Sequence, residues 1–343
     1  MSPEGQDRLQ RLECRVDRAR AGERLDRFLP EAVSRLHGVE LSRRAVRRAL
    51  QAGAVYVDDK RVRVASRALQ TGQRVLIVLE QGAQGLREAP ATPPPELVPE
   101  HVLFEDRDLI AIHKPAGLPT QATQTDALGH AEEMVRRYLA KGSKGPGHEA
   151  PYLALHQRLD RGTSGVLVMV KTKRSNVGMA AAFRNGAVDK VYKILAADDG
   201  TAGPLPDEPW TVDMALRKDG RRMVPDSLVP DSLGLDSLGK DAITELRRLE
   251  ALPETVGHPP CFLLEARPKT GRKHQIRAHL AAVGLPILGD RLYAERPISQ
   301  LAPRPMLHAY SLSFEHPVTS EPIRIVCPEP DDFKALCRSD AGT

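Results

Sequence analysis

The sequence predicts an α+β protein in which a small basic module precedes a larger domain, itself built on a largely antiparallel mixed sheet with flanking helices. Its 343 residues suffice for about two domains. A proline-rich stretch, EAPATPPPELVP at residues 88–99, is typical of a stiff linker between domains. Beyond it, short apolar strand patterns are mixed with helical patterns, which indicates an α+β domain.

The predicted division of the chain follows these changes in composition. The triplet Asp-Ser-Leu recurs between residues 226 and 238 with a period of five, which matches neither helix nor strand. We therefore interpret 225–239 as an exposed low-complexity insertion. In chain order, the predicted segments are a charged tail at 1–23, the basic module at 24–85, the Pro-rich linker at 86–99, the larger domain at 100–335 and a tail at 336–343.

Composition narrows the class of protein. Apolar residues make up 41% of the chain and charged residues 28%, as in soluble globular proteins. The longest aliphatic run, at 166–170, is too short to span a bilayer, and the first residues lack the apolar stretch of a signal peptide. The four cysteines form no CxxC pair, so neither a zinc ribbon nor a disulfide framework is indicated. We expect a cytoplasmic protein without a membrane partner.

Positive charge is concentrated at the N-terminal end. Residues 1–80 hold 17 Lys and Arg against 11 Asp and Glu, a net charge of +6, whereas the whole chain carries +5. All but one of these basic residues are arginine, which pairs with phosphate and stacks on bases. The pattern indicates either a module that faces nucleic acid or a surface that is basic without binding anything.

A first helix and three strands are predicted in the basic module. Apolar residues recur at helical spacing from Leu25 to Leu36, and we expect Pro30 to kink or split this helix. Strand patterns flank a turn at 58–60, which indicates a hairpin, and the segment 73–79 predicts another strand.

A second helix is marked at both ends, by Ser42 as N-cap and Gly53 as C-terminal stop. At 100° per residue, its arginines occupy one arc and its apolar residues the opposite arc. The arginine face could follow phosphates without reading a base sequence. The residues predicted to bind nucleic acid on this face are Arg43, Arg44, Arg47 and Arg48.

The larger domain opens with VLFEDRDLIAIHKPAG at 102–117, which predicts two strands joined by a turn and followed by a Pro/Gly loop. Further strands are predicted at 166–171, 188–196, 261–267 and 309–315, and helices at 173–185 and 272–283.

The segment LHQRLDRGTSGVLVMVKT, at 155–172, carries the strongest chemical signal. Asp160 lies in a loop rich in Gly, Thr and Ser, between Arg158 and Arg161 and just before an apolar strand. Neighbouring positive charge keeps a carboxylate ionised, as a nucleophile or a base requires. The alternative is a turn aspartate that caps a loop and pairs with arginine.

Residues 24–80 resemble a small RNA-binding module, the S-four type, known from a ribosomal small-subunit protein and from tyrosyl-tRNA synthetase. The matching residues are the LDRFL opening, the Ser-Arg-Arg helix start and the turn Gly-Ala-Val-Tyr-Val-Asp-Asp-Lys. The resemblance implies a structured RNA as partner.

The larger domain resembles the RluA family of RNA pseudouridine synthases. His156, Arg158-Leu159-Asp160 and Thr163-Ser164-Gly165 match the active-site signature of that family, except that Gln157 separates His156 from the Arg-Leu-Asp run. Four more segments match in order: Asp108-Leu109-Ile110 with Lys114-Pro115-Ala116-Gly117; Lys190-Val191-Tyr192; Thr270-Gly271-Arg272 through His274-Gln275-Ile276-Arg277 to Gly289-Asp290; and Leu307-His308-Ala309 with His316-Pro317.

This resemblance implies an isomerase that converts uridine to pseudouridine, with Asp160 as its catalytic carboxylate. It implies that Tyr192 stacks on the target uracil and that Arg277 forms an ion pair with Asp160. Arg158 would enter the RNA stack where the target base leaves, and we place Arg161 beside it as a second substrate-binding residue. We expect a monomer that does not bind DNA.

The reaction needs no cofactor and no metal, because no atom is gained or lost and no redox change occurs. The sequence fits this, since it lacks a P-loop, GxGxxG, HExxH and any cysteine cluster. His274, Gln275 and His308 are interpreted as structural hydrogen-bonding residues.

Several alternatives stay open at this point. Tyr192 could be a packed strand tyrosine and Arg277 a surface arginine. We prefer large-subunit ribosomal RNA to transfer RNA as the target, and a non-catalytic RNA-binding or ribosome-assembly protein is a further possibility. A serine acylase is disfavoured, because its SxxK fragment at 237–240 lies within the low-complexity repeat and no SDN accompanies it.

Overall fold

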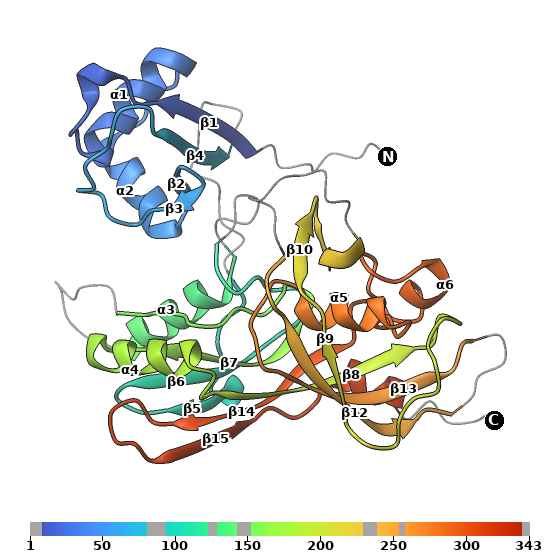
Figure 1. Ribbon diagram of the computed structural model, residues 1–343. Helices are drawn as coiled ribbons and strands as arrows, with labels where there is room; N and C mark the ends of the chain where they lie inside the picture. Colours follow the sequence, from blue (N-terminus) through green and yellow to red (C-terminus); the bar gives the residue numbers. More distant parts are fainter. Residues whose placement is uncertain are drawn as a thin grey trace, which may run out of the picture. The chain divides into compact units, whose positions relative to one another are not determined.

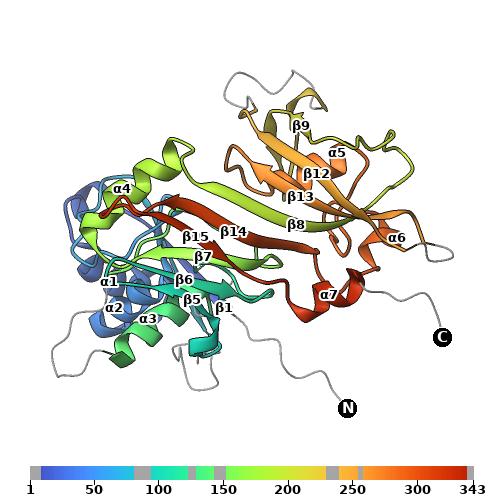
Figure 2. The same cartoon turned by 90° about the horizontal axis from the view of Figure 1, so that it is seen from below.

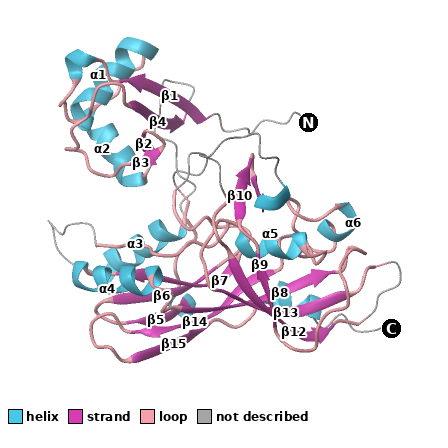
Figure 3. Ribbon diagram, viewed as in Figure 1, coloured by secondary structure: helices cyan, strands magenta, loops and turns pink. Residues whose placement is uncertain are grey.

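The computed structural model describes residues 9–80, 94–122, 129–142, 152–228, 239–253 and 258–337. The chain forms two compact units, one of residues 1–97 and 118–150 and the other of residues 98–117 and 151–343. The course of the chain and its secondary structure can be followed in Figures 1, 2 and 3. Each unit is described by itself.

The first unit contains a four-stranded antiparallel sheet with the strand order β1-β4-β2-β3. Its strands are β1 (Leu9–Arg15), β2 (Val55–Val57), β3 (Lys60–Arg61) and β4 (Arg74–Glu80). Part of the predicted charged tail is therefore an ordered strand, since β1 pairs with β4 along its whole length. Leu12, Cys14 and Val16 are buried at alternate positions, and this period of two is the signal of a strand in the sequence.

Helix α1 (Leu25–His37) runs through Pro30 as one element, so the predicted split does not occur. Burial explains this, because Phe28 and Leu29 before the proline and Val33 after it are fully buried on the same helix. A short 3-10 helix, η1 (Arg18–Arg20), precedes it.

Helix α2 (Arg43–Ala52) has the predicted ends. The Ser42 hydroxyl accepts a hydrogen bond from the Ala45 amide at 3.1 Å, and Gly53 adopts the left-handed conformation that ends the helix. The predicted hairpin is also present between β2 and β3. Its two turn residues, Asp58 and Asp59, both have positive φ angles, 49° and 62°, as a two-residue hairpin loop requires.

By their contacts, residues 118–150 cluster with the first unit, and the predicted domain at 100–335 stays a prediction. Here α3 (Ala131–Gly142) carries Glu132, which is buried and forms ion pairs with Arg63 and Arg136 at 3.1 and 3.0 Å. Arg61 donates a hydrogen bond to the Gln121 side chain at 2.7 Å. These long-range contacts, which composition does not reveal, tie the segment to the basic module.

The second unit contains a nine-stranded sheet with the order β5-β6-β7-β14-β8-β13-β12-β9, and β15 pairs with β14. Its strands are β5 (Val102–Glu105), β6 (Leu109–Lys114), β7 (Ser164–Val170), β8 (Asp189–Ala197), β9 (Trp210–Asp213), β12 (Ile243–Ala251), β13 (Cys261–Pro268), β14 (Leu307–Glu315) and β15 (Pro322–Val326). Every pairing is antiparallel except that of β7 with β14. The predicted largely antiparallel mixed sheet is confirmed.

The helices of the second unit flank this sheet (Figure 1). Helix α4 (Lys173–Arg184) packs on β7, and α5 (Gln275–Ala282) packs on β12 and β13. Shorter elements are η2 (Pro99–His101), η3 (Asp226–Leu228), α6 (Arg296–Ser299) and α7 (Asp331–Cys337). A separate hairpin of β10 (Leu216–Asp219) and β11 (Arg222–Pro225) contacts α5.

Three predicted segments fall partly outside the described residues. The predicted insertion begins with η3 at 226–228, and its residues 229–238 lie outside the described part of the chain. The same holds for 86–93 of the predicted linker and 338–343 of the predicted C-terminal tail.

Candidate active site

Asp160 lies in the loop that leads into β7. The Thr163 amide donates a hydrogen bond to the Asp160 carbonyl at 3.0 Å, which closes a tight turn, and β7 follows with every residue buried. The carboxylate is 28% exposed at the edge of this buried strand. The loop therefore presents one acidic side chain while its backbone is held by the sheet.

Arg277 binds Asp160 through Nη1, which lies 2.8 Å from Oδ2. Its Nε and Nη2 atoms donate to the two carboxylate oxygens of Asp290, at 2.6 and 2.8 Å. Burial lowers the pKa of Arg277, but the hydrogen bonds and charges of Asp290 and Asp160 outweigh burial and hold that pKa above its ordinary value. The predicted Asp160–Arg277 ion pair is confirmed.

Asp290 is fully buried and received no role from the sequence. Besides Arg277, it accepts hydrogen bonds from the backbone amides of Leu292 and Tyr293, at 3.0 and 3.3 Å. The only signal was that Gly289-Asp290 lies within a segment matched to the RluA family. Its contact with Arg277, thirteen residues earlier, is a matter of tertiary structure.

His274 and Tyr293 are two further residues of the site. The Nε2 atom of His274 is 3.8 Å from Oδ2 of Asp160, and its Nδ1 atom is 3.0 Å from the Tyr293 hydroxyl. The Arg277 guanidinium lies over the Tyr293 ring, 5.0 Å from its centroid. Tyr293 thus contacts both groups that face Asp160. The predicted structural hydrogen bond of His274 is present.

Tyr192 lies on β8, paired with Ala266 of β13 and Ala309 of β14. Burial raises the pKa of its phenol, and the negative charge of Asp160 adds to this rise. The charge of Asp160 thus acts on the phenol, and the strand pairings hold Tyr192 in the interior of the sheet.

The loop after β6 makes hydrogen bonds to the Asp160 loop. Lys114 is fully buried, and its ammonium donates to the carbonyls of Pro115 and Arg161, at 2.8 and 3.5 Å. Gly117 and Arg161 exchange two hydrogen bonds, from the Gly117 amide at 2.7 Å and from Arg161 Nε at 2.9 Å. Burial lowers the pKa of Lys114 to about 7, although the charge of Asp160 opposes that change.

The remaining predicted residues differ in their surroundings. Arg158 is exposed and makes no hydrogen bond or ion pair with any residue that the structure describes. The side chain of Arg161, in contrast, is engaged with the Gly117 carbonyl. His156 bonds Asn176 at 2.8 Å and stacks on Phe183, so its ring is used in packing.

The four arginines of α2 are not equivalent. Arg43 is exposed, whereas Arg47 forms an ion pair at 3.1 Å with Asp26, whose side chain is only 2% exposed. The side chains of Arg44 and Arg48 lie outside the described part of the structure. At least one arginine of the predicted RNA-binding face therefore also serves the fold.

Gln275 and His308 are structural, as predicted. Gln275 accepts from the Thr270 hydroxyl and donates to the Ile243 carbonyl, at 2.7 and 2.9 Å. His308 is fully buried and bridges the Ser164 hydroxyl and the Cys327 carbonyl, both at 2.9 Å.

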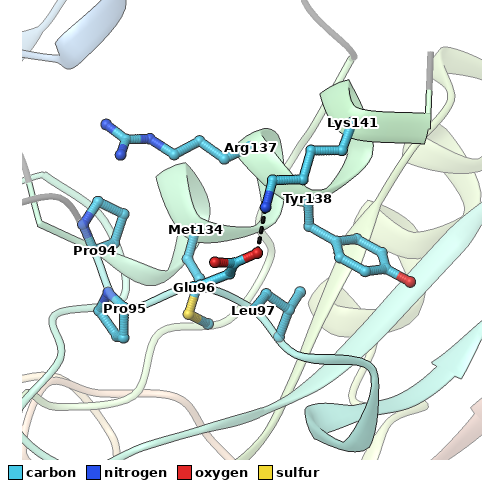
Figure 4. A pocket seen from close by; sticks show the side chains of 8 residues that line it. All are labelled: Pro94, Pro95, Glu96, Leu97, Met134, Arg137, Tyr138 and Lys141. Carbon is cyan, nitrogen blue, oxygen red and sulfur yellow. Dashed lines mark hydrogen bonds and ion pairs between the residues drawn. The ribbon is translucent and has the colours of Figure 1, made fainter. Parts of the chain in front are cut away.

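A pocket in the first unit lies between α3 and residues 94–97 (Figure 4). Its two central charged groups, Glu96 and Lys141, pair with each other, and none of the predicted catalytic or substrate-binding residues lines it. Within the described ranges, no group of three or more His, Cys, Asp or Glu residues could hold a metal ion. No described helix combines the length and apolar character needed to cross a membrane.

Comparison with known proteins identifies a family for each part of the chain. The sequence model of the RNA pseudouridylate synthase family matches residues 108–282, and that of the S4 domain matches residues 23–75. An "Uncharacterized RNA pseudouridine synthase" of Aquifex aeolicus is 29% identical over 331 residues, which are 92% of each chain. A "Ribosomal large subunit pseudouridine synthase D" of Haemophilus influenzae is 27% identical over 345 residues, which are 95% of this chain and 93% of that one.

Among solved structures, the human protein "RNA Pseudouridylate Synthase Domain Containing 4" is similar to this chain, with 26% sequence identity and a TM-score of 0.51. The similarity covers 68% of this chain and 90% of the human one.

Proposed function

The chain belongs to the RNA pseudouridylate synthase family, and from that premise we propose that it isomerises specific uridines in large-subunit ribosomal RNA, with Asp160 as the catalytic carboxylate. The observation that carries this assignment is the contact between Asp160 and Arg277, whose guanidinium is itself anchored by buried Asp290. The guanidinium fixes one oxygen of a carboxylate that is 28% exposed, so the carboxylate is oriented and can still reach a substrate.

The reaction breaks the glycosidic bond of uridine, turns the base and rejoins it to the sugar through a ring carbon. Cleavage passes through an oxocarbenium-like sugar, which a nearby carboxylate can stabilise or trap. Asp160 Oδ2 is held by Arg277, whereas Oδ1 accepts no hydrogen bond from any described residue. Oδ1 is therefore the oxygen that we assign to the ribose.

Tyr192, Arg158 and Arg161 are the proposed substrate-binding groups. Tyr192, whose phenol feels the charge of Asp160, would stack on the extruded uracil, an interaction that contributes roughly 1–3 kcal/mol. Exposed Arg158 would fill the gap that the base leaves, which offsets part of the few kcal/mol that extrusion costs. Arg161 would bind the RNA beside Arg158, while its Nε atom donates to the Gly117 carbonyl.

Two observations favour ribosomal RNA as the target. Relatives that match more than nine-tenths of this chain bear the name ribosomal large subunit pseudouridine synthase D. The S4 domain at 23–75 adds a second RNA-binding element, and Arg43 is exposed on it. Transfer RNA is the alternative substrate. The four cysteines are free thiols, which fits a reducing cytoplasm as the compartment.

The test compares wild type, Asp160→Ala and Asp160→Asn for tritium release from carbon 5 of labelled uridine. The substrates are large-subunit ribosomal RNA and, in parallel, bulk transfer RNA. Asp207→Asn is the matched control, because its side chain is 90% exposed and pairs with Arg248, to which no role is assigned.

We expect release from ribosomal RNA by wild type and by the control, and none by either Asp160 variant, while RNA affinity stays within about threefold. Activity of Asp160→Ala within about tenfold of wild type would refute the site. Tritium release from transfer RNA alone would refute ribosomal RNA as the substrate.

A further inference from the structure

Asp160 Oδ2 faces a second group that the proposed mechanism does not use. The Nε2 atom of His274 lies 3.8 Å from Oδ2, the oxygen that Arg277 Nη1 binds at 2.8 Å, and the His274 side chain is only 12% exposed. This separation is just beyond hydrogen-bond length, so a small movement of either side chain would close it.

The position of the proton on His274 follows from the hydrogen bonds of Tyr293. The Tyr293 oxygen accepts from the Met223 amide at 2.7 Å, so its own proton is available to the His274 Nδ1 atom at 3.0 Å. With Nδ1 as acceptor, a neutral ring carries its proton on Nε2 and directs it at Asp160. Burial lowers the pKa of His274, which favours this neutral ring.

The backbone supports the same orientation. His274 has φ 53° and ψ 18°, the left-handed region that a side chain other than Gly, Asn or Asp adopts at a cost. It precedes α5 without capping it through its side chain. Since the ring makes no capping bond, its contacts with Tyr293 and its approach to Asp160 are what this unusual conformation achieves.

We propose that His274 is a positioning residue for Asp160, an Nε2–H donor that closes on Oδ2 when RNA binds, and that Tyr293 sets its tautomer and direction. The inference rests on Asp160 as the catalytic carboxylate. Arg277 and His274 together occupy Oδ2, which leaves Oδ1 to meet the ribose.

Two substitutions at His274 separate this role from a structural one. His274→Asn places an amide where Nδ1 was, so it keeps the Tyr293 contact and loses the group facing Asp160. His274→Gln places its amide where Nε2 was and keeps the donor facing Asp160. If the role of His274 were merely structural, the Asn variant would be the more active of the two, because Asn tolerates the left-handed region better than Gln.

We expect the opposite order. In single-turnover assays on ribosomal RNA with the full-length protein, His274→Asn should lower the rate by about 10- to 100-fold without changing the RNA dissociation constant. His274→Gln should recover at least about tenfold of that loss. Equal rates for the two variants, a faster Asn variant, or an effect confined to RNA affinity would each overturn the proposal.

Tyr293→Phe tests whether the Tyr293 hydroxyl orients His274. It keeps the ring beneath Arg277 and removes the hydroxyl, which both orients His274 and accepts the Met223 amide. Losing the Met223 bond should have the same effect in either background. We therefore expect a several-fold loss of rate in the wild-type background and a clearly smaller loss in the His274→Asn background, because the hydroxyl then has no donor to orient. Additive losses would overturn the role assigned to Tyr293.

The Asp160→Ala variant, assayed alongside, separates the two proposals. If Asp160→Ala is inactive and His274→Asn matches wild type, only the role of His274 fails. If Asp160→Ala is active, the proposed site itself fails.

Discussion

At the scale of single residues, the site depends on how charges are shared. One guanidinium, that of Arg277, serves two carboxylates, and the two differ in exposure. Asp290 is fully buried and satisfied by Arg277 and two backbone amides, so it fixes the arginine. Asp160 is 28% exposed and receives one bond, so it stays available to a substrate. The difference in burial separates the anchoring carboxylate, Asp290, from Asp160, the one we propose to be catalytic.

A second buried carboxylate, Asp108, gives a prediction about stability and pH. It is 4% exposed and accepts bonds from Arg174 Nε at 2.9 Å and Nη2 at 2.5 Å, which hold its pKa well below the ordinary value although burial opposes them. Asp108→Asn should lower the free energy of unfolding by about 1–2 kcal/mol at pH 7.

The sign of the pH effect follows from the depressed pKa in the folded state. The stabilisation from Asp108 is present above the unfolded pKa of about 3.9 and is lost as the pH falls below it toward the folded pKa. Urea unfolding at pH 7, 5 and 3 should therefore show the difference between wild type and variant shrinking at pH 3. A difference that stays constant would contradict this, and Asp207→Asn is the exposed control.

At the scale of elements, α2 shows how one helix serves two purposes. Its N-cap and its C-terminal glycine are local features, and both formed as predicted. Its arginine face is not uniform, because Arg47 pairs with buried Asp26 of α1 while Arg43 is exposed. The sequence shows the arc of arginines but not which members the fold itself employs.

This difference predicts distinct effects of two matched substitutions. Arg43→Ala should reduce the magnitude of the log–log salt slope of RNA binding by about 0.7–0.9, the contribution of one phosphate contact, and leave stability within about 0.5 kcal/mol of wild type. Arg47→Ala should also lower the free energy of unfolding by about 1 kcal/mol, since Asp26 then keeps only Arg24.

Salt titrations of RNA binding and urea unfolding of both variants provide the measurements. An unchanged salt slope in Arg43→Ala would show that this face of α2 does not contact RNA.

At the scale of the whole second unit, a single parallel pairing of strands joins the two parts of the nine-stranded sheet. Strands β7 and β14 meet at Ser164 with His308 and at Gly165 with Ala309, and this contact joins the β5-β6-β7 half to the rest. The same junction follows directly after the Asp160 loop. The single parallel junction of the sheet and the Asp160 loop are thus neighbours in sequence.

Gly165→Ala should break this junction. Gly165 has φ 120°, and an added Cβ atom would lie 2.2 Å from the Ala309 carbonyl oxygen, so the strands would have to separate. We expect loss of most soluble protein and of activity. Gly186→Ala is the matched control, with φ 71° and open space around the added atom, and it should lower stability by only about 1 kcal/mol.

Thermal unfolding and soluble yield of the two glycine variants test this prediction. A Gly165→Ala protein as stable as Gly186→Ala would mean that β7 and β14 can move apart without cost.

Local patterns predicted most elements, because each depends on residues close in sequence. The cap at Ser42, the turn at Asp58 and the buried strand after Asp160 all formed as expected. The predicted helix at 272–283 begins only at Gln275, since His274 is held in a left-handed conformation by distant contacts. Strand β1 was missed because its charged residues outweighed the alternation of its apolar ones.

The sequence by itself determined the family and the pairing of Asp160 with Arg277, since these residues stand in motifs that follow one another in order along the chain. The catalytic role of Asp160 is our proposal. Only the tertiary structure decided that Asp290 anchors Arg277, that Tyr293 orients His274, and that residues 118–150 join the first unit. Each of these depends on a contact between side chains distant in sequence or on different elements. Such contacts follow from packing in three dimensions, which residue type and spacing along the chain do not specify.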